Sequence, residues 1–247
     1  MKIIVQKQFE MATFMAAKEI ELLIRRQNKV VLGLATGSTP LLLYQELIRL
    51  HQEADLDFSN VVTFNLDEYC GLDKSHPGSY YYYMHENFFR HINIKPGNVH
   101  IPNGAAVDIL EECEKYEKTI ASFGGIDLQV LGVGRHGHIG FNEPSSSLAS
   151  RTRIKTLTEI TRKDNALSFS SLDAVPHHVI TMGVKTIMEA KQVILLASGQ
   201  HKSLIIKQVI EGPLTAMVPG SILQMHPKAR IYLNSEAASK LAVQGFN

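Results

Sequence analysis

The sequence predicts an α/β fold that is built around a largely parallel sheet. Apolar runs of strand length alternate with longer segments that carry apolar residues at helical spacing, and this alternation is typical of βαβ units. Hydrophobic residues make up 45% of the 247 positions, which is enough for a large core. No repeat, low-complexity tract or Pro/Gly-rich linker divides the chain. We therefore expect one domain over residues 1–247.

The expected elements follow one another along the whole chain. The strands are short apolar runs, at residues 30–36, 61–66, 127–133, 178–183, 192–198 and 229–233. The helices carry apolar residues three and four positions apart, at residues 9–26, 40–53, 79–91, 107–122, 201–211 and 235–243. Ligands of such sheets bind beyond the carboxyl ends of the strands. Motifs that directly follow strands should therefore share one location.

Composition excludes several classes of partner. A formal net charge of +1 provides no basic field, so nucleic acid is not expected as a partner. No apolar stretch approaches the roughly 20 residues that span a bilayer, and the run at residues 1–5 is too short for a signal peptide. We expect a cytoplasmic protein without a membrane partner. Cys70 and Cys113 lack metal-type spacing, which predicts two reduced thiols.

The first motif follows the expected strand 30–36. The chain breaks at Gly37 and should enter a helix with Thr39 as N-cap and Pro40 as first helical residue. The free N–H groups of that turn and the hydroxyls of Ser38 and Thr39 would form an anion site, although an ordinary capped turn fits the same pattern. The Gly-Lys-Ser/Thr of a P-loop is absent, which favours a sugar phosphate over a nucleoside triphosphate.

The second motif is the pair of carboxylates Asp67 and Glu68, which follows the expected strand 61–66. One of the two is a candidate general base. Neighbouring side chains of an extended segment point to opposite sides, so we expect one carboxylate to face the pocket and the other to be solvated or paired. A merely solvated turn is the alternative that spacing leaves open.

The third motif, residues 132–144, packs two imidazoles and a carboxylate among four glycines. Glycine permits close approach to the backbone, so the motif predicts an active-site loop. It contains Gly-x-Gly-x-x-Gly, but no helix pattern follows, so we expect no dinucleotide cofactor. His136, His138 and Glu143 match the ligand types of a zinc site. The favoured interpretation is a metal-free acid–base pair in which Glu143 orients His138.

Together these motifs resemble the glucosamine-6-phosphate deaminase (isomerase) family. The similar segments are Ala35–Pro40, Phe64–Tyr69, Gly137–Pro144, Ser147–Thr156 and Leu223–Lys228. Their order and spacing are more specific than any single segment, and the resemblance covers nearly the whole chain. It implies a modified Rossmann-like, mostly parallel sheet with helices on both faces. It also implies conversion of glucosamine 6-phosphate and water to fructose 6-phosphate and ammonia, without a cofactor.

The resemblance implies a role for each motif. His138, backed by Glu143, would open the sugar ring, and Asp67 would carry a proton from C2 to C1. The sugar phosphate would be held by Lys202, which supplies a point charge at the start of the expected helix 201–211. The residues that share the phosphate with it would be Thr36, Gly37, Ser38 and Thr39.

Two positions depart from the family pattern. His136 belongs to the expected catalytic group, but the family has an acidic or amide residue there, and an imidazole brings no fixed negative charge. Leu167 stands where the family has a phosphate-binding arginine, and Arg135 and Arg162 are candidate replacements. We expect substrate binding to be weaker by about 1.5–3 kcal/mol because one charge-assisted contact is lost.

The sequence leaves three alternatives. A galactosamine-6-phosphate isomerase differs only in sugar stereochemistry. A 6-phosphogluconolactonase would use a histidine for lactone hydrolysis, although Asp67 and the Ser147–Thr156 segment favour the deaminase. A catalytically weakened sugar-phosphate sensor would fit His136 and Leu167, but the single helix expected before residue 30 leaves no room for a DNA-binding helix-turn-helix.

Some family members are activated by N-acetylglucosamine 6-phosphate at a subunit interface. Arg153 and Lys155, with Ser146 and Ser147 nearby, match positions that the family associates with this site. The chain ends at Asn247, short of the carboxyl-terminal segment of regulated members. We therefore expect the two basic residues to make structural ion pairs instead. A homo-oligomer is compatible with the sequence.

Overall fold

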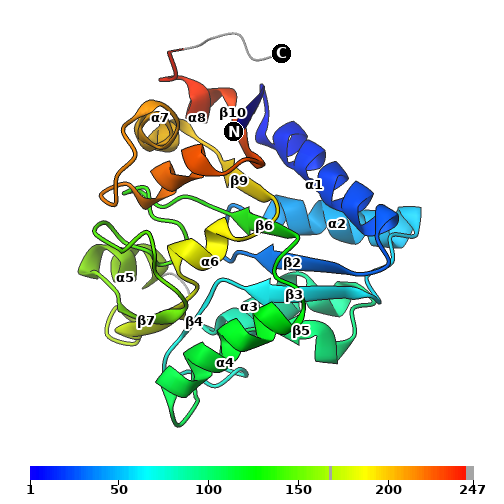
Figure 1. The fold of residues 1–247 in the computed structure, drawn as a ribbon, viewed down its shortest axis with the longest axis vertical. Helices are drawn as coiled ribbons and strands as arrows, with labels where there is room; N and C mark the ends of the chain where they lie inside the picture. The colour runs from blue at the N-terminus through cyan, green and yellow to red at the C-terminus, as the bar shows by residue number, and fades with distance from the viewer. Residues whose placement is uncertain (167–168, 243–247) are drawn as a thin grey trace.

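A seven-stranded parallel sheet forms the centre of the computed structural model, which describes residues 1–166 and 169–242 (Figure 1). The strand order is β1-β10-β9-β6-β2-β3-β5, and every neighbouring pair is parallel. The strands are β1 (Lys2–Gln6), β2 (Val30–Leu34), β3 (Val61–Asn65), β5 (Val99–His100), β6 (Leu128–Leu131), β9 (Val193–Ala197) and β10 (Ala229–Asn234). The predicted mostly parallel sheet is confirmed.

A second sheet of three antiparallel strands lies beside the first, in the order β4-β8-β7. Its strands are β4 (Asp67–Tyr69), β8 (His178–Thr181) and β7 (Arg153–Thr156). The expected strand 178–183 thus exists, but it pairs in this sheet and not in the parallel one. Only Leu66 separates β4 from β3, so the small sheet continues from the carboxyl edge of the large one.

Helices cover both faces of the parallel sheet, as predicted. One core cluster packs the sheet against α1 (Phe9–Arg26), α2 (Leu41–Ala54) and α3 (Tyr80–Asn87). The cluster on the other face packs it against α4 (Ile109–Ser122), α6 (Val184–Met188), α7 (Ser203–Glu211) and α8 (Ser235–Ala238). A short helix of seven residues, α5 (Glu159–Asn165), lies outside these layers and near the small sheet (Figure 1).

Several boundaries differ from the sequence prediction. The helix at residues 9–26 is preceded by β1, whose five partly exposed residues are too few to stand out as an apolar run. The expected helix 235–243 ends at Ala238, and residue 243 lies outside the described residues. The expected helices 79–91 and 201–211 are each divided into an α-helix and a 3₁₀ turn, at Phe89–His91 and Gln200–Lys202.

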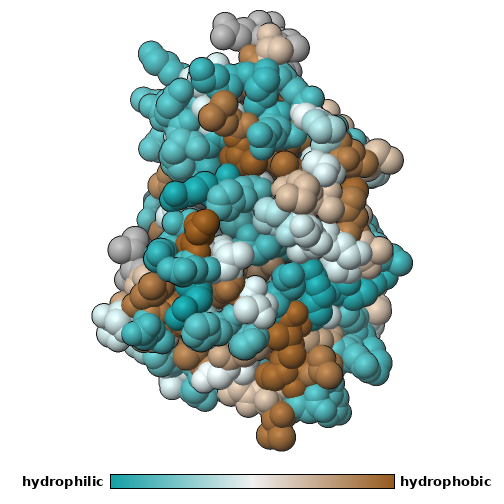
Figure 2. Space-filling view, turned by 90° about the vertical axis from the view of Figure 1, so that its left-hand side faces the viewer, coloured by the Kyte–Doolittle hydropathy of each residue, from teal (hydrophilic) through white to brown (hydrophobic). Residues whose placement is uncertain are grey.

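The surface that carries α5 and β7 is a mosaic in which hydrophilic groups surround small hydrophobic clusters (Figure 2). Such scattered apolar groups are normal on folded proteins. Among the described helices, none combines the length and the hydropathy that crossing a membrane requires.

The two adjacent carboxylates of β4 point in opposite directions, as the alternation of an extended strand predicts. Glu68 is only 3% exposed, so of the two environments expected for the second carboxylate, solvated or paired, the structure shows the paired one, with backbone groups as partners. Its oxygens accept hydrogen bonds from the backbone N–H groups of Tyr69, Tyr80 and Tyr81, at 2.8, 2.9 and 2.9 Å. Two of these donors belong to the first turn of α3, where a negative charge is stabilising. Glu68 therefore joins β4 to α3.

Replacing Glu68 by alanine should lower the free energy of unfolding by about 2–4 kcal/mol, because one buried and two partly buried N–H groups would lose their acceptor. Urea denaturation would measure the change. Glu86→Ala is the matched control on the same helix, since Glu86 makes a surface ion pair with Arg90 and its loss should cost about 1 kcal/mol or less. Equal losses in the two variants would contradict the assigned role of Glu68.

Candidate active site

The loops after β2, β3, β6 and β9 enclose a cavity of about 540 Å³ at the carboxyl edge of the parallel sheet. This is where the topology of such sheets predicts a ligand site. Most of the residues that the sequence singled out line it: Thr36, Gly37, Ser38, Thr39, Asp67, His138 and Lys202. The three motifs therefore meet in one cavity.

The turn after β2 differs in detail from the prediction. Helix α2 begins at Leu41, Pro40 takes the N-cap position, and no side-chain hydrogen bond caps the helix. The assignment of Thr39 as N-cap and Pro40 as first helical residue is therefore wrong by one position. The turn adopts a left-handed conformation at Gly37, with φ of 95°, which favours glycine. The Tyr83 hydroxyl donates to the Gly37 carbonyl at 2.6 Å, so α3 holds the turn in place.

Asp67 is a buried carboxylate in the floor of the cavity, with 4% of its surface exposed. Burial, reinforced by the negative charge of Glu68, raises the pKa of Asp67 to about 8. Burial raises the pKa of each of four tyrosines as well, and the charge of Asp67 adds to the effect at Tyr44, Tyr69, Tyr80 and Tyr116. A carboxyl group that exchanges its proton near neutral pH is suited to act as a general base.

The His138–Glu143 pair is present. His138 Nδ1 lies 3.4 Å from Glu143 Oε2, which is ion-pair distance without the geometry of a hydrogen bond. The Thr161 hydroxyl donates a short hydrogen bond to the other oxygen of Glu143. Burial alone would raise the pKa of Glu143, but the contacts with His138 and Thr161 lower it below the ordinary value. Glu143 is therefore an ionised carboxylate that faces the back of the imidazole.

The glycines of the third motif allow the close approach that the sequence predicts. Gly134 donates its N–H to the His138 carbonyl at 2.9 Å, and a Cβ at Gly134 would stand 1.9 Å from His138 Nε2. The imidazole thus occupies the space that a side chain would need. Gly140 brings the same loop to the base, because its Cβ would stand 3.4 Å from Asp67 Oδ2. The loop thus approaches Asp67 at Gly140, and both His138 and Asp67 line the same cavity.

Two cations reach the cavity from different loops. Lys202 donates from Nζ to the Val133 carbonyl at 2.9 Å. Burial lowers the pKa of Lys202, and the positive charge of Arg135 lowers it further. Of the two arginines considered as phosphate ligands, Arg135 lines the cavity. Arg162 is buried and donates to the carbonyls at positions 172 and 175, so it holds that segment instead.

Comparison with known proteins identifies the family of the chain. Residues 8–232 match the family described as glucosamine-6-phosphate isomerases/6-phosphogluconolactonase. The chain belongs to this family. A protein named glucosamine-6-phosphate deaminase from Thermoanaerobacter pseudethanolicus is 52% identical over 239 residues, with 97% of this chain and 94% of that protein covered. Another of that name, from Pseudarthrobacter chlorophenolicus, is 54% identical over 232 residues, which are 94% and 89% of the two chains.

Solved structures of the family agree with the fold. A monomeric glucosamine-6-phosphate deaminase superposes with a TM-score of 0.95 at 44% identity, over 97% of this chain and all of that one. The 6-phosphogluconolactonase of Trypanosoma brucei superposes with a TM-score of 0.77 at 21% identity, over 98% of each chain. The second likeness concerns the fold alone. The modified Rossmann-like sheet is therefore the common scaffold of both activities in this family.

This family member has cavity residues that the sequence analysis missed. They come from α3, α5 and the turn before α7, and include Tyr80, Tyr83, Thr161, Asp164, Asn165 and His201. The helix at residues 79–91 was predicted, and its run of four tyrosines after Ser79 is the sequence feature that could have indicated a contribution of α3 to the cavity. His136, which belongs to the expected catalytic group, is exposed and does not line the cavity. Among the described residues, no three His, Cys, Asp or Glu side chains cluster as metal ligands would.

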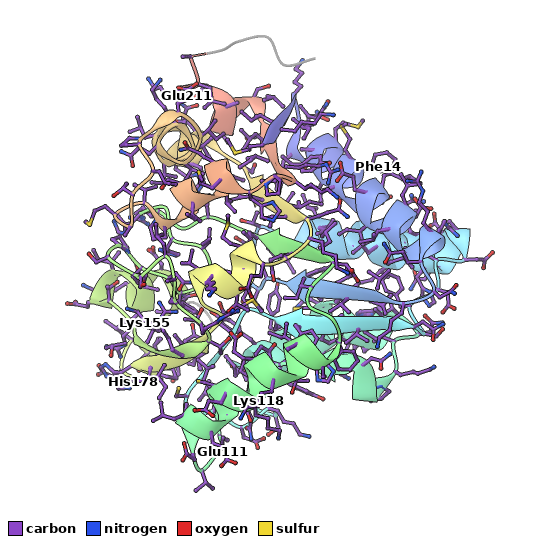
Figure 3. All side chains as sticks on the ribbon, viewed as in Figure 1. Phe14, Glu111, Lys118, Lys155, His178 and Glu211 are labelled. Atoms are coloured by element: carbon purple, nitrogen blue, oxygen red, sulfur yellow. The ribbon has the colours of Figure 1, made fainter. Side chains whose placement is uncertain are left out.

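The basic residues that match the regulatory positions lie on β7, outside the cavity lining. Within the described ranges neither Arg153 nor Lys155 forms an ion pair, so the expected structural pairs are wrong there. The Arg153 guanidinium instead donates to the Arg151 carbonyl at 3.3 Å, and burial lowers its pKa. Lys155 pairs with Val179 of β8, and both Lys155 and His178 are labelled at the small sheet in Figure 3.

Substituting Gly134 by alanine should displace the His138 imidazole, because the new Cβ would occupy its position. We expect a loss of about 1–3 kcal/mol in the free energy of unfolding and a changed His138 imidazole signal in NMR spectra. Gly132→Ala is the matched control, since a Cβ there meets nothing within 4 Å. Unchanged His138 signals in Gly134→Ala would refute this packing.

Proposed function

We propose that the chain is a glucosamine-6-phosphate deaminase, which converts glucosamine 6-phosphate and water to fructose 6-phosphate and ammonia. The observation that carries the proposal is that Asp67, His138 and the Gly37 turn open into one cavity. The names of relatives that are about half identical over nearly the whole chain support the same activity. The cavity is of the size that small-molecule ligands require.

The phosphate would bind at the end of the cavity where the turn after β2 meets Lys202. The backbone of residues 36–39 and the hydroxyls of Ser38 and Thr39 supply neutral hydrogen-bond donors there. Lys202 supplies the positive charge that compensates the dianion. Held in this way, the substrate would direct its sugar carbons toward Asp67 and His138, which line the same cavity.

His138 would open the sugar ring by moving a proton between the anomeric hydroxyl and the ring oxygen. Its Nδ1 faces Glu143, so Nε2 is the nitrogen that is left for the substrate. Glu143 is held in turn by Thr161, and this fixes the orientation of the imidazole. His136 would not contact the substrate, because it lies outside the cavity lining.

Asp67 would then carry out the isomerisation. In the open-chain aldehyde the C1 carbonyl acidifies the C2 proton, and Asp67 takes that proton to leave an enol-type intermediate. The same carboxyl group returns the proton at C1, which lies on the same face of the substrate. The imine formed at C2 is hydrolysed and releases ammonia. A buried carboxylate with a raised pKa is a stronger base than a solvated one, so burial favours the first step.

Replacing Asp67 by asparagine should lower kcat for ammonia release by roughly 100- to 10,000-fold, because the isosteric amide cannot accept the C2 proton. Binding of fructose 6-phosphate should persist, since the phosphate turn and Lys202 are unaltered. A coupled ammonia assay and a product-binding titration measure the two effects. Full activity in Asp67→Asn would eliminate this carboxylate as the base.

The pH dependence of the reaction should follow the ionisation of Asp67. Because the pKa of Asp67 is raised to about 8, the carboxyl group is protonated below that pH and accepts a proton only above it. The value of kcat/KM should therefore rise with pH through the weakly alkaline range, far above the ordinary titration of aspartate. A pH–rate profile that is already flat from pH 5 upward would contradict the assignment.

The substrate itself is tested by comparing three compounds with the same purified protein. We expect ammonia release from glucosamine 6-phosphate to be faster than from galactosamine 6-phosphate. Hydrolysis of 6-phosphogluconolactone should be weak or absent, because lactone hydrolysis has no use for the Asp67 base. Lactone hydrolysis as the dominant activity would overturn the proposal. Binding of the amino sugar phosphate without any ammonia release would make the chain a sensor.

A further inference from the structure

We propose that Arg135 is a second cationic ligand of the substrate phosphate and that Asp164 competes with the phosphate for its guanidinium. The inference rests on the proposed function, since it requires a phosphorylated substrate. It assigns a specificity-determining role to a residue pair that joins Arg135, in the loop after β6, to Asp164 of helix α5.

The position of Arg135 suits this role. It lines the same cavity as Lys202 and the turn at residues 36–39. Among residues 1–166 and 169–242, it is the one arginine that does so. Its guanidinium donates to Asp164 Oδ1 at 3.1 Å, and Asp164 also lines the cavity. The charged ends of both side chains are therefore at the entrance that a phosphate must pass or occupy.

The charge of the ligand calls for a second cation. A phosphate monoester carries a charge of about −1.5 to −2 near neutral pH. Lys202 supplies a single positive charge and uses one of its donors on the Val133 carbonyl. Arg135 and Lys202 line the same cavity, and the positive charge of Arg135 adds to the lowering of the Lys202 pKa that burial causes. A bound phosphate would relieve their repulsion.

The contact with Asp164 leaves Arg135 available. It is a single contact between side chains that are 68% and 42% exposed, and exposed pairs of this kind contribute little net stability. The remaining guanidinium donors form a planar fork that matches two phosphate oxygens. A dianion can thus compete for the guanidinium. Asp164, as the competing acceptor, would weaken phosphate binding while it limits the rotamers of Arg135.

The test is a double-mutant cycle read out by calorimetric titration with inorganic phosphate. Arg135→Gln should weaken phosphate binding by roughly tenfold or more, the usual worth of a charge-assisted contact. Arg135→Lys should weaken phosphate binding less than Arg135→Gln does, because the positive charge remains although the planar guanidinium is lost. Asp164→Asn should tighten binding severalfold. That gain should vanish in the double variant Arg135→Gln/Asp164→Asn, since there is no guanidinium left to release.

Matched controls come from another ion pair of α5, Lys163–Glu159, which does not line the cavity. Lys163→Gln and Glu159→Gln each remove one charge of the same sign as Arg135 or Asp164, from the helix that carries Asp164, and should leave phosphate affinity within about twofold. If Lys163→Gln and Arg135→Gln weakened phosphate binding equally, the effect would come from the overall electrostatic field of the protein and not from a direct contact. That result would overturn the inference. So would a gain from Asp164→Asn that survives in the double variant.

Measurement of ammonia release separates this inference from the proposed function. In active protein, Arg135→Gln should raise KM for glucosamine 6-phosphate about as much as it weakens phosphate binding and should change kcat little. If the wild type releases no ammonia, the proposed function fails, and the phosphate titration still tests Arg135. If ammonia is released and Arg135→Gln binds phosphate as the wild type does, only the role of Arg135 fails.

Discussion

The burial of the Asp67 carboxylate at the junction of the two sheets is the constraint on which the site depends. Asp67 opens β4 directly after the buried strand β3 and pairs with Thr181 of β8, so its side chain cannot turn out to solvent. The alternation of the strand then directs Glu68 to the other side, where it binds the first turn of α3. Tyr83 of that helix holds the Gly37 carbonyl. One dipeptide thus connects the proposed base, Asp67, with the proposed phosphate-binding turn at Gly37.

The loop after β6 completes the site because side chains pack closely against its glycine backbone. Gly134 leaves room for the His138 imidazole, and Gly140 lets the same loop pass beside Asp67. Glu143 and Thr161 fix the far side of the imidazole, so the acid–base pair is oriented by residues from the loop and from α5. The proposed catalytic groups are therefore positioned by packing and by backbone contacts more than by direct bonds to one another.

The sequence predicted the parallel sheet and the cavity because strand ends carry their motifs to one edge whatever the connecting helices do. It did not predict the small antiparallel sheet, because three of the four residues of β7 (Arg153–Thr156) are polar and its register is set by tertiary pairing with β8. The sequence also did not predict that Tyr83, Asp164 and His201 line the cavity, because the packing of helices brings them there. The prediction of Thr39 as N-cap was wrong because Pro40 takes the N-cap position, one residue later.

The central claim is that a buried carboxyl group, kept protonatable near neutral pH, is the base of this site. Titration of the Asp67 carboxyl carbon by ¹³C NMR, assigned through the missing signal of Asp67→Asn, tests it most directly. The account predicts a midpoint near the pKa of about 8 that burial and Glu68 impose. A midpoint within the ordinary range of solvated aspartate would show that the carboxylate is neither buried nor tuned, and would contradict the account.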